Sequence, residues 1–135
     1  MTLEQLEKLK VKVNNDLQLT DANVLDKSLN LPILYQKYLD VFISQMRVFK
    51  NLERDKQNMY SKKYHHYKFE GDFQLDSKGE IETYINGDDD YDELLRKYNV
   101  QALVIEYLEN VLDNIKKLTF TIKNYVTFKM FLSGQ

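Results

Sequence analysis

The chain has 135 residues, 43% of them hydrophobic, a formal net charge of −2 and no cysteine. This length predicts one domain over residues 1–135, and the absence of cysteine excludes disulfides, zinc–thiolate sites and thiol nucleophiles. The longest apolar run, Ala102–Ile105, is far shorter than the roughly 20 residues of a membrane span, so no membrane contact is expected.

Residues 1–30 are predicted to form short N-terminal helices. Thr2 and Gln5 have the spacing of a capping box, in which each side chain accepts a hydrogen bond from the other residue's backbone. Thr20 or Asp21 can cap a second short helix. Because lysines and glutamates are interspersed with the first leucines, the segment lacks the apolar run of a secretion signal. We therefore expect the chain to stay in the cytoplasm.

A long helix is predicted over residues 31–68. Asn30 suits its N-cap, and the only proline suits its first turn, where a missing N–H breaks no helical hydrogen bond. No glycine or proline interrupts residues 33–70. A wide apolar stripe at three- and four-residue spacing runs from Leu34 to Leu52 and then stops. We therefore expect the helix beyond Leu52 to protrude from the core.

The protruding part of this helix is predicted to be basic. Residues 44–68 carry seven Lys or Arg against two Asp or Glu, whereas residues 69–93 carry one against ten. Cations interleaved with tyrosines suit single-stranded DNA, because cations neutralise phosphates and the rings stack on unpaired bases. The candidate DNA-binding residues are Lys50, Arg54, Lys56, Lys62, Lys63, Tyr64, Tyr67 and Lys68.

The same segment allows a structural interpretation, in which the tyrosines pack in a core or between copies and the lysines are solvated. A metal site is not expected here, because His65 and His66 point about 100° apart on a helix. The sequence also lacks the Walker A, GxGxxG, GxSxG and HExxH patterns. We therefore expect a protein that is not an enzyme and that needs no metal or cofactor.

Residues 69–87 are predicted to connect two long helices, because three of the four glycines lie there. Within this segment the alternation of Ile81, Thr83 and Ile85 suits one short extended piece. The acidic run that follows is expected to supply an N-cap for the next helix, from Asp88 or Asp90.

A second long helix is predicted over residues 88–133. Its apolar residues follow a seam of alternating four- and three-residue steps that only Gln101 and Thr119 interrupt, and further apolar residues flank this seam. We expect the two long helices to pair as a hairpin. One partner helix would not cover so wide an apolar surface, so we also expect a homo-oligomer. The candidate oligomerisation residues are Leu108, Leu112, Ile115, Ile122 and Val126.

Several segments together resemble one protein family. They are Leu34-Tyr-Gln-Lys-Tyr-Leu39, Lys62-Lys-Tyr-His-His-Tyr67, and the stretch from Val111 to Lys123 with the closing Phe131-Leu-Ser-Gly134. In these segments the chain resembles the UvsY recombination mediators of T-even-like phages. It also resembles them in its length, its Leu-Glu-Gln-Leu start and its acidic insert.

The resemblance implies an all-α protein whose copies form a ring-like homo-oligomer and bind single-stranded DNA. It also implies two protein partners, a RecA-like recombinase and a single-strand-binding protein. Such a protein would help load the recombinase onto DNA coated by the single-strand-binding protein. If it is phage-encoded, it would act in the host cytoplasm. By this resemblance the family's Lys-x-Arg pair aligns with Ser61 and Lys63, so the first basic position is missing unless Lys62 replaces it from the neighbouring position. The alternative function is a helical homo-oligomeric scaffold or adaptor without nucleic-acid binding.

Overall fold

The computed structural model describes residues 1–71, 75 and 77–134, and these residues are helical with no strand. The elements in chain order are α1 (Leu3–Leu17), α2 (Val24–Leu29), α3 (Leu31–His65), the π-helical turn η1 (His66–Glu70), α4 (Lys78–Asn86) and α5 (Asp89–Leu132). The expected all-α class is confirmed. No helix in the described part of the chain is both long and apolar enough to span a membrane.

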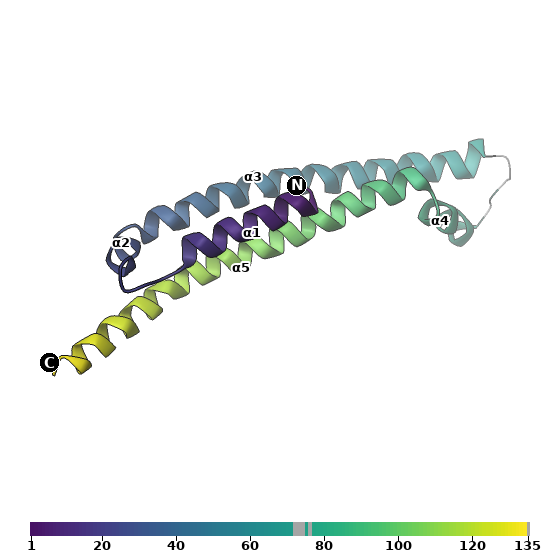
Figure 1. Ribbon diagram of the computed structural model, residues 1–135. Helices are drawn as coiled ribbons and strands as arrows, with labels where there is room; N and C mark the ends of the chain where they lie inside the picture. Colours follow the sequence, from purple (N-terminus) through teal and green to yellow (C-terminus); the bar gives the residue numbers. More distant parts are fainter. Residues whose placement is uncertain (72–74, 76, 135) are drawn as a thin grey trace.

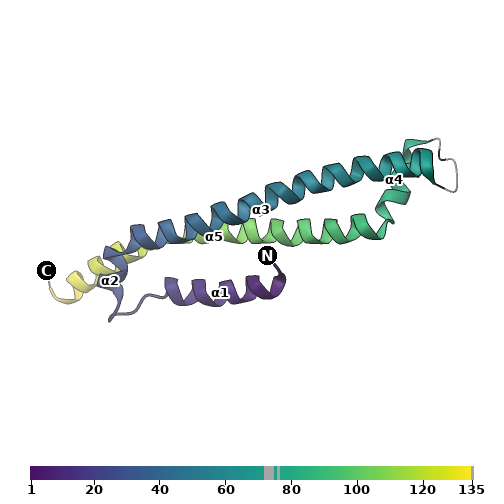
Figure 2. The same ribbon diagram turned by 90° about the horizontal axis from the view of Figure 1, so that it is seen from above.

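The two long helices α3 and α5 run antiparallel as a hairpin (Figure 1). The short α1 lies along this pair on one side, α4 lies at the turn, and α2 lies where α3 begins (Figure 2). The last part of α5 extends past the start of α3 in both views. The predicted hairpin is therefore confirmed.

Local capping explains where two of the helices begin. The Thr2 side chain accepts a hydrogen bond from the Gln5 backbone, and the Gln5 side chain accepts one from Thr2, so the predicted capping box is present. Asp88 caps α5 by accepting a hydrogen bond of 3.0 Å from the Tyr91 N–H. Such caps satisfy backbone donors that a helix leaves unpaired at its start.

The predicted extended piece around Ile81 is wrong, because these residues form α4. Ile81 and Ile85 are both buried while Thr83 is exposed, which matches the four-residue repeat of a helix. A strand would instead place all three side chains on one face. The Ser77 side chain accepts a hydrogen bond from the Glu80 N–H and caps the helix.

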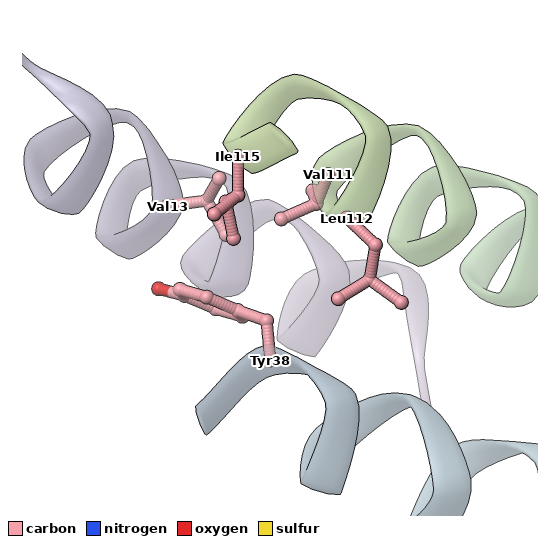
Figure 3. Close-up of a cluster of buried hydrophobic side chains, with 5 residues drawn as sticks. All are labelled: Val13, Tyr38, Val111, Leu112 and Ile115. Carbon is pink, nitrogen blue, oxygen red and sulfur yellow. The ribbon is translucent and has the colours of Figure 1, made fainter. Parts of the chain in front are cut away.

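The core lies where α1 covers the groove between α3 and α5. In one cluster, Val13 of α1 and Tyr38 of α3 point toward three side chains of α5, Val111, Leu112 and Ile115 (Figure 3). In the next, Leu6 packs on Val104 and Leu108. Burying each such aliphatic side chain contributes about 1.5–3 kcal/mol. The α5 seam is therefore covered within one chain by both α1 and α3.

This packing buries most of the candidate oligomerisation residues within one chain. Four of them, Leu108, Leu112, Ile115 and Ile122, are buried in the core of a single protomer. Of the five, Val126 is the one that is exposed, with 48% of its surface accessible. The sequence pattern identified a buried seam, but α1, which was not counted as cover, fills much of it.

Gln101 interrupts the seam without leaving an unsatisfied polar group. Its side chain is fully buried, and its amide nitrogen donates to the backbone oxygen and to Oε1 of Gln45, at 2.9 and 3.0 Å. Its Oε1 accepts a hydrogen bond of 2.9 Å from the Met1 ammonium. Gln101 thus joins α5 to α3 and to the start of the chain.

Asp16 joins the end of α1 to α3. Its Oδ2 accepts hydrogen bonds of 2.6 Å from both the Lys37 ammonium and the Tyr38 hydroxyl. Partial burial raises the pKa of Asp16, but the hydrogen bonds from Lys37 and Tyr38 outweigh it and hold the pKa below its ordinary value. The charged carboxylate is therefore the form that stabilises the fold.

We expect Asp16→Asn to lower the free energy of unfolding by about 1–2 kcal/mol at neutral pH. The folded-state pKa is depressed, so the stabilisation is present above the unfolded pKa of about 3.9 and is lost as pH falls through the folded value. Urea unfolding at several pH values should show the two proteins converging in acid. Asp40→Asn, at an exposed position, serves as the control, and a difference that stays the same at every pH down to the acid unfolding of the protein would contradict this account.

Candidate nucleic-acid interface

The basic end of α3 does not protrude, contrary to the expectation from its apolar stripe. Met59, Tyr60 and Tyr64 of α3, together with Tyr67 of η1, pack against a buried cluster formed by Ile81, Ile85 and Tyr91. The rings of Tyr60 and Tyr91 meet edge to face at a centroid distance of 6.0 Å. The aliphatic stripe ends at Leu52 because tyrosines replace it, and α4 supplies the surface that covers them.

Asp88 is the centre of a polar cluster beside these rings. Its Oδ2 accepts a hydrogen bond of 2.6 Å from the Tyr67 hydroxyl and lies 3.2 Å from the Lys63 ammonium. Lys63 also lies 3.1 Å from Oδ2 of Asp90. We call these four residues the Asp88 cluster. It ties the end of the basic helix to the start of α5.

The electrostatics of the Asp88 cluster favour its charged form. The Asp88 side chain is only 9% exposed, and this burial raises its pKa, but hydrogen bonds from Tyr67, Tyr91 and Lys63 outweigh it and lower the pKa. The hydrogen bonds to Asp90 and Asp88 raise the pKa of Lys63. Lys63, 23% exposed, is therefore already engaged by two carboxylates.

We expect Lys63→Ala to lower the free energy of unfolding by about 1–2 kcal/mol, because Asp88, in a nearly buried position, would lose the charged partner that the structure gives it. Lys62→Ala is the matched control, since its side chain is exposed and its removal should change stability by less than about 0.5 kcal/mol. Urea unfolding of both variants measures the difference. Equal stabilities for the two variants would show that the Asp88 cluster does not stabilise the contact between the end of α3 and the start of α5.

Lys56 also makes a contact within the chain. Its ammonium lies 4.0 Å from the centroid of the Tyr98 ring, in a cation–π contact. Tyr98 in turn stacks on Phe49 at a centroid distance of 5.0 Å. Lys56, Lys63, Tyr64 and Tyr67 thus share the side of the basic segment that packs on α4 and α5.

The other four candidate residues face outward. Lys50, Arg54, Lys62 and Lys68 are exposed, and Arg47 and His65 lie beside them. At 100° per residue, the members of this set that belong to α3 span an arc of about 120°. We call these six residues the outward basic face. Arg47 and His65 were not among the candidate residues, although helical spacing places them on this side.

The charges of the outward basic face are largely free. Lys50 pairs with Glu53 at 3.4 Å, whereas Arg54, Lys62 and Lys68 form no ion pair with any residue that the structure describes. Lys50 and Lys62 are about 18 Å apart along α3, at the α-helical rise of about 1.5 Å per residue. A row of free cations can neutralise successive phosphates of a strand, and such contacts carry no base specificity.

Comparison with known proteins matches the chain to one protein family and to crystal structures of similar fold. The family model described as "Recombination, repair and ssDNA binding protein UvsY" matches residues 12–135. Three crystal structures of the bacteriophage T4 recombination mediator protein UvsY are similar in fold to this chain. No curated protein sequence gives a significant match.

The three crystal structures agree closely in coverage. The lattice type II structure has a TM-score of 0.84 at 21% identity and covers 98% of both chains. The lattice type IV structure has a TM-score of 0.84 at 20% identity, covering 93% of this chain and 97% of the other. The lattice type I structure has a TM-score of 0.78 at 20% identity, covering 92% and 98%.

Proposed function

The chain belongs to the UvsY family of recombination, repair and single-stranded-DNA-binding proteins, and we propose that it is a recombination mediator that binds single-stranded DNA along its outward basic face. The observation that carries this proposal is the row of exposed cations on α3 and η1, of which Arg54, Lys62 and Lys68 have no carboxylate partner among the described residues. Phosphates of a flexible strand are the natural counter-charges for such a row.

The candidate DNA-binding residues then fall into two groups. Lys50, Arg54, Lys62 and Lys68 contact phosphates. The remaining candidates position the helix that carries them, since Lys63 and Tyr67 are bonded to Asp88, and Lys56 covers Tyr98. With Tyr64 also packed inward, base stacking contributes little. Binding is therefore expected to be strongly salt-dependent and nearly independent of sequence.

We place the contact between copies on the exposed end of α5 rather than on its buried seam. Phe120, Phe128 and Phe131 are exposed and fall within an arc of about 80°, roughly opposite Ile115 and Ile122. Exposed aromatic residues in such a group are typical of a surface that another chain covers. A ring of copies would present several outward basic faces to one strand and would increase the overall affinity.

In this role the protein holds single-stranded DNA while a RecA-like recombinase replaces a single-strand-binding protein on it, in the cytoplasm of the cell. The protein itself supplies binding and positioning, not catalysis. The test measures the DNA-dependent ATPase of such a recombinase on DNA coated with single-strand-binding protein, with and without this protein. Faster onset of ATPase supports the mediator. No stimulation, together with no salt-dependent DNA binding, would favour the scaffold or adaptor instead.

A further inference from the structure

A groove of about 440 Å³ lies between the α2–α3 junction and α5. These segments are at the end of the hairpin away from α4 (Figure 1). We call it the α5 groove. Its volume falls in the range of about 300–1,000 Å³ typical of ligand pockets. Leu31, Pro32, Tyr35, Ile115 and Ile122 form its apolar lining, and Ser28, Lys116, Thr119 and Lys123 supply its polar groups.

The groove exists because of the second interruption in the α5 seam. Thr119 occupies the seam position between Ile115 and Ile122, where a Leu or Ile would fill the space against α3. Unlike Gln101, which is buried and fully hydrogen-bonded, Thr119 is exposed. The seam therefore opens here into a surface whose floor is apolar.

The charge around the α5 groove is positive. Lys116 and Lys123 form no ion pair with any residue in the described ranges, and the Lys116 ammonium lies 5.8 Å from the centroid of the Tyr35 ring. Residues 114–135 contain four lysines and neither Asp nor Glu. The carboxylate of Asp21, which reaches α5 from the loop before α2, is engaged by Tyr125 and Lys129.

We propose that the α5 groove binds an acidic peptide segment of a partner protein, with one large apolar side chain seated on the floor and carboxylates paired with Lys116 and Lys123. This site is separate from the outward basic face and does not depend on DNA binding there. The α5 end of a second copy is a poor occupant of this groove, because residues 114–135 offer no side-chain carboxylate to pair with Lys116 and Lys123. Aliphatic side chains and proline dominate the floor, which suits an apolar side chain better than a stacked base.

The test uses fluorescence anisotropy with a dye-labelled peptide of Asp and Glu residues around a single Phe. Thr119→Leu should fill the groove and weaken binding by roughly tenfold or more without removing a charge. Lys123→Gln should weaken binding and reduce its salt dependence. Lys117→Gln is the matched control, because Lys117 is an exposed neighbour that does not line the groove. Peptides with Asn and Gln for the acids, or Ala for the Phe, should bind poorly.

Each alternative gives a different result. Equal losses in Lys117→Gln and Lys123→Gln would show attraction to general positive charge, and full binding by Thr119→Leu would exclude the groove. Both outcomes overturn the proposal. The proposal is also overturned if the wild type does not bind the peptide and Thr119→Leu changes the oligomeric mass. It is likewise overturned if the wild type does not bind the peptide and Thr119→Leu loses affinity for single-stranded DNA. Circular dichroism of each variant confirms that the helices remain intact.

Discussion

Replacing Leu108 by Asp should strongly destabilise the protomer, whereas replacing Phe128 by Asp should leave its stability unchanged and separate its copies. Leu108 has no exposed surface and packs with Leu6 and Val104, so a carboxylate there has no partner and no water. The expected loss of about 3–5 kcal/mol is a large part of an ordinary domain's stability of about 5–15 kcal/mol. Phe128 is 57% exposed, so its change affects only the surface that we propose lies between copies.

Circular dichroism and light scattering separate these two outcomes. Leu108→Asp should lose its helical signal at a lower temperature than the wild type, and Phe128→Asp should melt like the wild type while its mass in solution falls. Val11→Asp is the control, because Val11, like Phe128, is an exposed apolar residue but lies on α1. A Leu108→Asp monomer that melts like the wild type would place that residue between copies. An unchanged mass for Phe128→Asp would remove the exposed end of α5 from the interface.

Removing three free cations of the outward basic face should weaken single-stranded DNA binding by roughly a hundredfold. The variant is Arg54→Ala, Lys62→Ala and Lys68→Ala combined. Each lost phosphate contact lowers the slope of log K against log salt by about 0.7, so three contacts lower it by about 2. The loss should be similar for oligonucleotides of different sequence, because phosphate contacts carry no base information.

The matched control for this variant removes three exposed lysines elsewhere, by changing Lys8, Lys12 and Lys117 to Ala. The net charge changes equally, so both proteins lose the same long-range attraction. Fluorescence anisotropy over a range of salt concentrations gives affinity and slope for each. Similar losses in the two triple variants would mean that net charge, and not the outward basic face, controls binding.

Much of the fold follows from local sequence signals. The absence of Gly and Pro from residues 33–70 and the capping residues Thr2 and Asp88 predict helices close to those observed. Periodicity also identifies the α5 seam that is buried in the core. These features are predictable because they depend on neighbours within a few residues along the chain.

The errors concern contacts between distant segments. Helix α4 was predicted as an extended piece, since in nine residues Ile81, Thr83 and Ile85 fit both periodicities. With α4 misassigned, nothing in the sequence indicated a cover for Tyr60 and Tyr64. The pairing of Lys63 with Asp88 and Asp90 depends on the hairpin bringing the basic and acidic segments together. Helical spacing divides the basic segment into faces but does not identify which face is buried.

The adjacent lysines 62 and 63 allow the most direct test of the proposed DNA site. Single-stranded DNA binding should be measured over a range of salt concentrations for Lys62→Ala and Lys63→Ala, both under conditions where the proteins are folded. We predict that Lys62→Ala lowers the salt slope by about 0.7 per strand contact, while Lys63→Ala leaves the slope unchanged because the Asp88 cluster already holds that ammonium. A reduced slope for Lys63→Ala with a normal slope for Lys62→Ala would contradict the outward basic face as the DNA site.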